Sequence, residues 1–222
     1  VSRAEGMMNM ISRNMLAGVR SVALPAFASA RRDSHDLDFA YTRSVGIVTV
    51  IVWPLFGLMA LFPLEALRII FGDQWDDAVP LVAVFCLSGA ILALHPFWGE
   101  FAISLGRIDL LMRTALIIKP LHLIILISAV LVFGTRESAA FAHLCASVIA
   151  VIVISRCRSK AFSVDLGKFH RQLRVSFLVS AVSLMPSLFL AANSGFSREE
   201  PIAIGWVFFA GMLSVGIWFV AA

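Results

Sequence analysis

The chain has 222 residues, of which 60% are hydrophobic and only 14% are charged, and its mean hydropathy is +0.92. A water-soluble domain carries about a quarter charged residues and could not bury this much apolar surface in one core. The composition therefore excludes an ordinary water-soluble domain and favours a protein that is solvated by lipid. The net charge of +4 says less than the distribution of the charges along the chain.

The first predicted element, Ser2–Ala30, is the least hydrophobic of the predicted helices. Arg13 and Arg20 lie where a signal peptide would carry its apolar region, so this element is not built like a signal peptide. We interpret it as a membrane helix that faces a polar interior. Because the chain begins with Val1 rather than Met, we also expect it to be a fragment of a longer protein.

Six further stretches have the length of transmembrane helices, since crossing roughly 30 Å of hydrocarbon takes about 20 mostly apolar residues. One of them, Leu110–Gly134, is interrupted by Arg113 and Lys119. The other five contain no Asp, Glu, Lys or Arg and are Ser44–Leu64, Ala78–Gly99, Ser138–Ser155, Val175–Ser197 and Pro201–Ala222. The sequence thus predicts an all-α polytopic membrane protein with about seven transmembrane helices. Four prolines inside these stretches are expected to kink them: Pro54, Pro96, Pro120 and Pro186.

An acidic stretch, FGDQWDDAVP (Phe71–Pro80), separates the first two uncharged stretches. The preceding residues, Leu64–Phe71, have the spacing of a short interfacial helix, which Gly72 can end. The next helix then begins with negative charges that its N-terminus stabilises, namely Asp73, Asp76 and Asp77. We interpret these acids as turn residues, and a cation site is the alternative.

Basic residues are distributed unevenly between alternate loops. One set of loops holds eleven of them, and the other set holds only Arg68, Arg136 and Arg198. Since short cytoplasmic loops are enriched in Lys and Arg, this distribution predicts Val1 outside and Ala222 inside. Six of the eleven lie in Arg156–Arg174. We interpret this segment either as a topology signal alone or as an amphipathic surface that lies on anionic lipid headgroups.

No motif for nucleotide, metal or disulfide chemistry is evident. Cys86, Cys145 and Cys157 are widely spaced and form no CxxC pair, and the chain has no GxxxxGK[ST] loop. The predicted outer loops gather no acids or histidines that could serve as a catalytic set. We therefore expect no enzyme activity, no cofactor, no metal and no nucleic-acid partner.

Four motifs carry a family resemblance: LPAFASARRDSHDLDFAYTRS (Leu24–Ser44), WPL (Trp53–Leu55), IIFGDQW (Ile69–Trp75) and SLGRIDLL (Ser104–Leu111). This pattern resembles the Wzx-type polysaccharide flippases of the multidrug/oligosaccharidyl-lipid/polysaccharide exporter superfamily. The resemblance implies two pseudo-symmetric six-helix lobes around a central cavity. The chain would supply part of the second lobe (1–158), a basic cytoplasmic loop (159–174) and two additional C-terminal helices (175–222).

The resemblance also implies a function. We expect transport of a lipid-linked oligosaccharide or polysaccharide across the bacterial inner membrane by alternating access. The expected partners are the lipid bilayer, the lipid-linked oligosaccharide, the missing N-terminal lobe and other polysaccharide-assembly membrane proteins. One alternative is a cation-coupled multidrug exporter, which would normally need buried carboxylates, whereas the near-membrane acids expected here are Glu5 and Glu100. The other is a structural membrane subunit.

Three polar residues of the first predicted helix are the main candidates for a substrate site. Asn9, Arg13 and Arg20 are spaced by four and seven residues and project from one helical face. Charged groups inside a membrane usually face a protein interior or a water-filled cavity, and arginine binds phosphate in two places. By the resemblance, this helix lines the central cavity. The alternative is that both arginines pair with the missing lobe.

A second group of polar residues is expected to be mainly architectural. Lys119 and His122 share one face of Leu110–Gly134, and Glu100 and Arg113 are predicted to form an ion pair. His95 and His143 could relay protons, but an isolated intramembrane histidine is more often a hydrogen-bonded packing residue.

Overall fold

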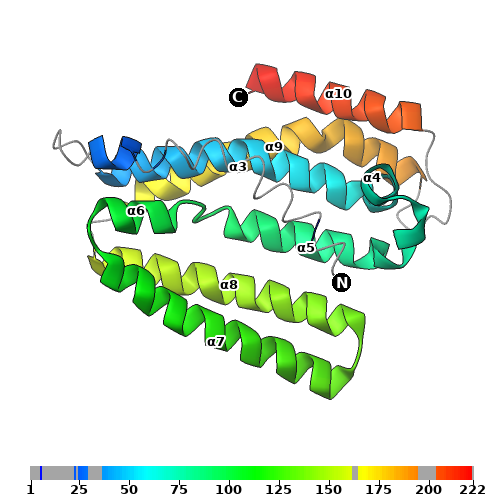
Figure 1. Cartoon of the computed structure of the whole chain (residues 1–222). Coiled ribbons are helices and arrows are strands. Elements are labelled where there is room, and N and C mark those ends of the chain that lie inside the picture. The colour runs from blue at the N-terminus through cyan, green and yellow to red at the C-terminus, as the bar shows by residue number, and fades with distance from the viewer. Residues whose placement is uncertain are drawn as a thin grey trace.

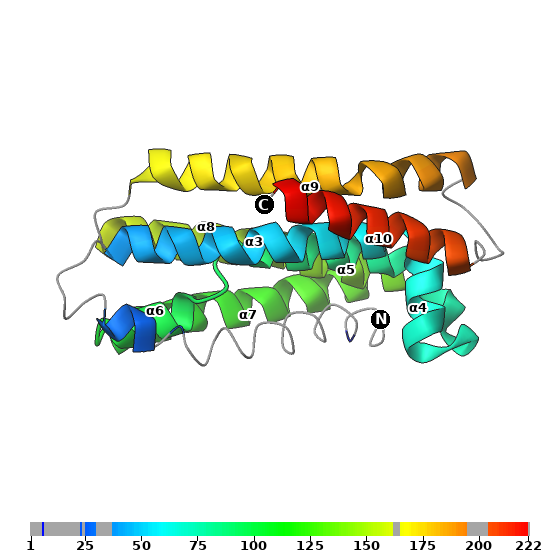
Figure 2. The ribbon, with the colours of Figure 1, turned by 90° about the horizontal axis from the view of Figure 1, so that it is seen from above.

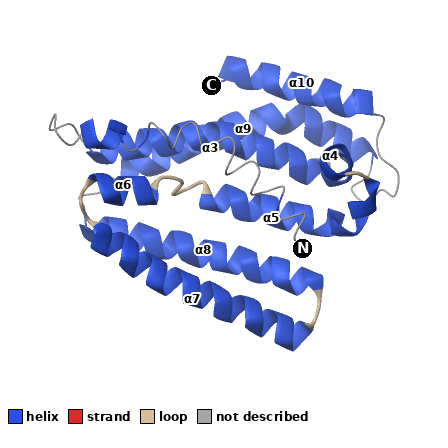
Figure 3. Ribbon diagram, viewed as in Figure 1, coloured by secondary structure: helices blue, strands red, loops and turns tan. Residues whose placement is uncertain are grey.

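The computed structural model describes residues 6, 23, 25–29, 37–161, 165–194 and 204–221, and every regular element in these ranges is helical (Figure 1, Figure 3). The all-α prediction is therefore confirmed. The elements are α3 (Leu37–Leu61), α4 (Pro63–Phe71), the 3₁₀ helix η2 (Asp73–Ala78), α5 (Val79–Leu92), α6 (Trp98–Ser104), α7 (Ile108–Phe133), α8 (Arg136–Ala161), α9 (Leu166–Ser194) and α10 (Ile204–Ala221).

Five helical segments among the described residues are long and apolar enough to cross a membrane. They are Leu37–Leu61, Asp73–Leu92, Ile108–Phe133, Arg136–Lys160 and Leu166–Asn193. Helix α10 is also apolar, although its qualifying stretch, Phe209–Trp218, is shorter. A multi-pass membrane protein is thus confirmed for the middle of the chain. Most of the first predicted helix, Ser2–Ala30, lies outside the described residues.

The long helices lie side by side in a row. Helix α10 packs on α9, α9 on α3, α3 on α5, α5 on α8, and α8 on α7 (Figure 1). Short helix α4 stands crosswise at the end of the row where α3 finishes (Figure 2). Because the sequence neighbours α7 and α8 form a hairpin while α3 pairs with the distant α9, the row combines local and long-range packing.

The second uncharged stretch is not one continuous helix, and the prediction of a helix over Ala78–Gly99 is wrong at its C-terminal end. Helix α5 stops at Leu92, and α6 begins only at Trp98. The break contains Pro96, which has no N–H and disfavours the helical conformation of the residue before it. One carbonyl freed near this break, that of Ala90, accepts a hydrogen bond from Trp53 Nε1 at 2.9 Å.

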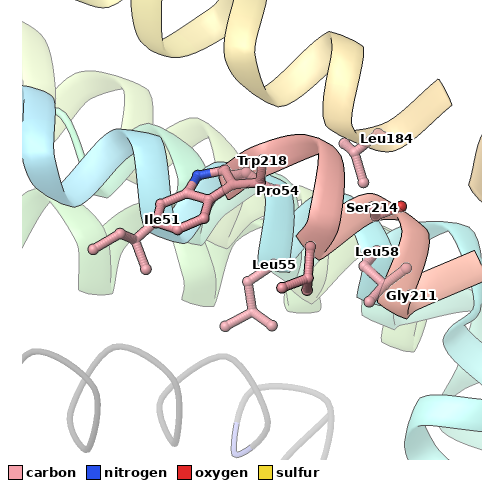
Figure 4. A pocket seen from close by; sticks show the side chains of 9 residues that line it. Ile51, Pro54, Leu55, Leu58, Leu184, Gly211, Ser214 and Trp218 are labelled. Atoms are coloured by element: carbon pink, nitrogen blue, oxygen red, sulfur yellow. The ribbon is translucent and has the colours of Figure 1, made fainter. Parts of the chain in front are cut away.

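Helix α3 continues through its own proline. Pro54 has no N–H to donate to the carbonyl of Val50, four residues earlier. Trp218 Nε1 of α10 donates to that carbonyl at 2.8 Å instead. Figure 4 shows Trp218 and Pro54 side by side along an apolar hollow of about 230 Å³ between α3, α9 and α10. A tryptophan from a distant helix therefore replaces the hydrogen bond that the proline removes.

A line of hydroxyl groups joins α9 to its two neighbours. Ser176 Oγ lies 2.9 Å from Thr49 Oγ1 of α3, and Ser187 Oγ lies 2.8 Å from Ser214 Oγ of α10. The buried serines of α9 are Ser176, Ser180, Ser183 and Ser187. Their spacing of three and four residues places them on one face of the helix. Small and hydroxyl residues allow membrane helices to approach closely and to hydrogen-bond across the contact.

Two glycines on α3 face α9 across the same contact. A Cβ added at Gly46 would overlap the side chain of Gln172, and one added at Gly57 would overlap Leu184. The absence of side chains at these two positions therefore sets how closely α3 and α9 approach.

The acidic turn follows the sequence prediction closely. Helix α4 ends at Gly72, whose φ of 88° is readily adopted by glycine. Arg68 Nε donates to Asp76 Oδ1 at 3.0 Å, and this hydrogen bond raises the pKa of Arg68. Arg136 Nη1 lies 3.4 Å from Asp77 Oδ2. Two of the three acids thus pair with arginines at this turn.

Most of the described residues in the predicted basic loop, 159–174, are helical. Helix α8 runs to Ala161 and α9 starts at Leu166. Asp165 caps α9 by accepting a hydrogen bond from the backbone N–H of Lys168 at 3.1 Å, which lowers the pKa of Asp165. The backbone N–H of Asp165 also donates to Asp38 Oδ2 at 2.9 Å. These contacts tie the α8–α9 turn to the start of α3.

Candidate functional site

The main sequence-predicted site lies outside the described residues. Asn9, Arg13 and Arg20 fall in the part of the chain whose structure is not described. Their assignment to a substrate cavity therefore stays a prediction from the sequence.

The second predicted group lies among the described residues. Arg113, Lys119 and His122 belong to α7, and Glu100 belongs to α6. Lys119 is exposed on α7, and His122 is half-buried on the same helix. The nearest ring nitrogens of His122 and His143 lie 3.3 Å apart across the α7–α8 contact. The sequence placed His122 with Lys119 but did not predict this pairing of histidines from neighbouring helices.

The ion pairs of the described residues do not include one between Glu100 and Arg113. Arg113 instead lines a hollow of about 520 Å³ together with Arg107 and Lys160. Arg107 in turn pairs with Asp109, with Nε 2.9 Å from Oδ1. The basic side chains of α7 and α8 thus gather around this hollow rather than pairing with α6.

The most unusual charged residue of the described chain is Arg158, near the C-terminal end of α8. Its side chain is only 3% exposed. The guanidinium carbon lies 4.8 Å from the centre of the Tyr41 ring and 4.5 Å from that of Phe169. Its Nε and Nη1 atoms have no hydrogen-bond partner among the described residues. Aromatic faces on α3 and α9 therefore hold this buried cation by cation–π contacts.

A short hydrogen-bonded path runs beside Arg158. The Tyr41 hydroxyl lies 2.9 Å from His95 Nδ1, and His95 Nε2 lies 2.7 Å from Ser155 Oγ. The imidazole also stacks on Phe169, with ring centres 6.1 Å apart and planes 9° apart. His95 lies in the break between α5 and α6, so this path connects α3, the break and α8.

This arrangement can hold helices together and can pass a proton between hydroxyl and imidazole groups. A neutral imidazole donates through one nitrogen and accepts through the other, so Tyr41 and Ser155 can occupy its two sides in either sense. Both ring nitrogens of His95 thus have hydrogen-bond partners, as expected for a hydrogen-bonded packing residue.

Sequence reasoning missed the role of Arg158, which it treated as part of a basic segment that is either a topology signal or an amphipathic surface on lipid headgroups. A periodic signal was present. Ala140, Ser147 and Arg158 are separated by seven and eleven residues, which is close to whole numbers of helical turns. All three are buried, so they share the inward face of α8. The aromatic partners could not be found in this way, because they come from distant helices.

A second residue that the sequence interpretation overlooked is Glu65 of α4. Its side chain is only 2% exposed. It lines a mainly apolar hollow of about 600 Å³ formed by α3, α4 and α10. The near-membrane acids therefore include a buried carboxylate besides Glu5 and Glu100.

These observations define an all-α, multi-pass membrane protein with buried polar groups between its helices. The family model described as "Polysaccharide biosynthesis protein" matches residues 1–80. The chain is 20% identical over 186 residues to "Lipopolysaccharide biosynthesis protein WzxC" of Escherichia coli (strain K12), covering 83% of the chain and 37% of that protein. It is 34% identical over 79 residues to "Succinoglycan biosynthesis transport protein ExoT" of Rhizobium meliloti (strain 1021), covering 35% of the chain and 16% of that protein.

The chain is thus similar to proteins of polysaccharide biosynthesis and transport, and the resemblance predicted from its motifs is confirmed. It spans well under half the length of each of these curated relatives. No solved structure matches the chain.

Proposed function

We propose that the chain is part of a transporter that moves a lipid-linked oligosaccharide or polysaccharide across the bacterial inner membrane. The observation that carries this proposal is that a row of apolar, membrane-length helices belongs to a chain whose relatives are named for polysaccharide biosynthesis and transport. Transport would proceed by alternating access between this part and a further lobe.

The proposed orientation, with the C-terminus in the cytoplasm, is supported by where the basic side chains lie. The N-terminal ends of α3 and α9 and the C-terminal end of α8 meet at one end of the row (Figure 1). That end carries Arg43, Arg156 and Arg174, whereas Arg68 and Arg136 lie near the turns at the opposite end. Labelling of introduced cysteines tests this proposal. Position 75 should react from outside and position 165 only from inside, and the reverse pattern would overturn the orientation.

Within this transporter, Arg13 and Arg20 are proposed to bind the phosphate groups of the substrate from a cavity-facing helix. Their fixed guanidinium geometry suits phosphate, and their charge persists throughout the transport cycle. The test is export of polysaccharide by the full-length protein carrying Arg13→Ala and Arg20→Ala. We expect export to be abolished while insertion into the membrane is unchanged. Normal export by the double variant would remove the cavity assignment.

A cation-coupled multidrug exporter is the second candidate, and the specific observation in its favour is buried Glu65. A carboxylate at the wall of an apolar hollow can bind a proton or an organic cation. Glu65→Gln keeps the shape of the side chain but removes its charge. Under this alternative, the substitution would abolish cation-dependent drug efflux. Under the polysaccharide proposal, it would leave polysaccharide export close to that of the unaltered protein.

A further inference from the structure

A hollow of about 660 Å³ lies between α3 and α9, close to the α8–α9 turn. Three basic side chains line it: Arg43 of α3, and Lys168 and Arg171 of α9. The two helices supply these charges from positions more than a hundred residues apart in the chain, so the hollow exists only because α3 and α9 pack together.

Two of the three basic side chains around this hollow have no ion-pair partner among the described residues. Lys168 Nζ lies 3.3 Å from Asp165 Oδ2 and is partly neutralised. Arg43 and Arg171 make no ion pair with any residue in the described ranges, and both are exposed. Two guanidinium groups from different helices therefore face one hollow with their charge available to an anion.

The other side chains that line the hollow are mostly apolar, and one carries a hydroxyl group. Phe39, Ile47 and Val175 give the hollow apolar walls, and their side chains are partly exposed. Thr42 also lines it and is 6% exposed, and its hydroxyl has no hydrogen-bond partner among the described residues. Cationic, hydroxyl and apolar surfaces thus adjoin one another at the end of two membrane helices.

We propose that this hollow is a binding site for an anionic phospholipid, with the headgroup phosphate between Arg43 and Arg171 and an acyl chain along Phe39, Ile47 and Val175. Basic pockets between membrane helices bind anionic headgroups in this way. The site uses residues other than Arg13 and Arg20, and the proposal does not depend on which molecule the protein transports.

The test is native mass spectrometry of the full-length protein that contains this chain, released from detergent with phosphatidylglycerol or phosphatidylcholine added at increasing concentration. The unaltered chain should retain phosphatidylglycerol in preference to phosphatidylcholine. Since each basic residue near such a headgroup contributes about fivefold in affinity, Arg43→Gln with Arg171→Gln should weaken retention about 25-fold. The charge-preserving pair, Arg43→Lys with Arg171→Lys, should retain most of the binding.

The matched control is Arg113→Gln with Lys160→Gln, which removes the same charge from the hollow between α7 and α8. This control should change retention less than about twofold, because its residues do not line the proposed site. An equal loss in both double variants would overturn the site in favour of a general surface charge. Competition by inorganic phosphate at the same concentration as the lipid would overturn the lipid assignment, since the acyl chain would then contribute nothing.

Discussion

Helices α3 and α7 have similar mean hydropathies over their membrane-spanning segments, 2.2 and 2.5, but very different surroundings. Within an apolar stretch of 18 residues in each helix, 39% of the α3 residues are buried inside the protein, whereas none of the α7 residues are. The comparison shows that hydropathy identifies a membrane helix without telling which other helices it contacts. In lipid, large aliphatic side chains are equally well solvated by acyl chains and by protein.

The difference between these two helices lies in their small and hydrogen-bonding residues. Helix α3 carries Gly46, Thr49 and Gly57 toward α9, and it is further held by Trp218 of α10. Helix α7 is mostly large and aliphatic along its outer faces, and the described residues pack against it chiefly through α8. Close contacts between these membrane helices therefore form where side chains are small or can hydrogen-bond across the contact.

The largest expected effect comes from filling the α3–α9 contact. Gly57→Leu would force α3 and α9 apart, because even a Cβ at this position overlaps Leu184. Overpacking of this kind costs about 1–3 kcal/mol of folding free energy. Reversible unfolding in mixed micelles would measure it. Gly216→Leu on α10 serves as the control, since a Cβ there meets nothing within 4 Å. Equal losses in both variants would contradict the importance of this contact.

The next effect isolates the hydrogen bond at the proline of α3. Trp218→Phe removes the N–H that reaches the Val50 carbonyl and should cost about 1–2 kcal/mol, because a buried acceptor is left unsatisfied. Pro54→Ala restores an N–H at position 54, which can bond to the same carbonyl within the helix. In that background, Trp218→Phe should cost markedly less. A double-mutant cycle measures this coupling, and strict additivity of the two changes would exclude the proposed replacement.

A smaller effect compares the same substitution on the two helices. Val52→Ala on α3 removes atoms from a side chain that is 2% exposed, and the resulting cavity should cost about 1 kcal/mol. Val132→Ala on α7 changes a side chain that is 72% exposed and should cost less than about 0.5 kcal/mol. Both are measured by the same unfolding assay. A large effect at Val132 would show that α7 is covered in the folded protein.

The sequence predicted the helices well and their contacts poorly. The spans, the short helix before Gly72 and the acidic turn all follow from local patterns, since apolar length, a glycine and a run of acids are each read within a few residues. The break after Leu92 was not predicted, although Pro96 was recognised, because a proline inside an apolar stretch can either kink or end a helix.

The candidate site shows the same limit more strongly. Arg158 contacts Tyr41 and Phe169, which belong to two other helices, so no spacing within α8 could identify them. Gln172 and Gly46 meet for the same reason, through the pairing of α9 with α3. The inward face of α8 was predictable from the helical spacing of its residues. The aromatic partners of Arg158 depended instead on the order in which the helices pack in the row. Apolar composition does not encode that order, so these residues were missed.

The smallest expected effect concerns Asp165, in the turn between α8 and α9. The hydrogen bond from the Lys168 N–H lowers the pKa of Asp165, so the ionised carboxylate stabilises the folded state. This contribution is complete above the pKa of an unfolded aspartate, about 3.9, and is lost as the pH falls through the lower pKa of the folded chain. Asp165→Asn keeps a capping oxygen but should remove this pH dependence. Unfolding measured between neutral and acidic pH would detect the difference, and identical acid sensitivity in both proteins would show that Asp165 does not contribute.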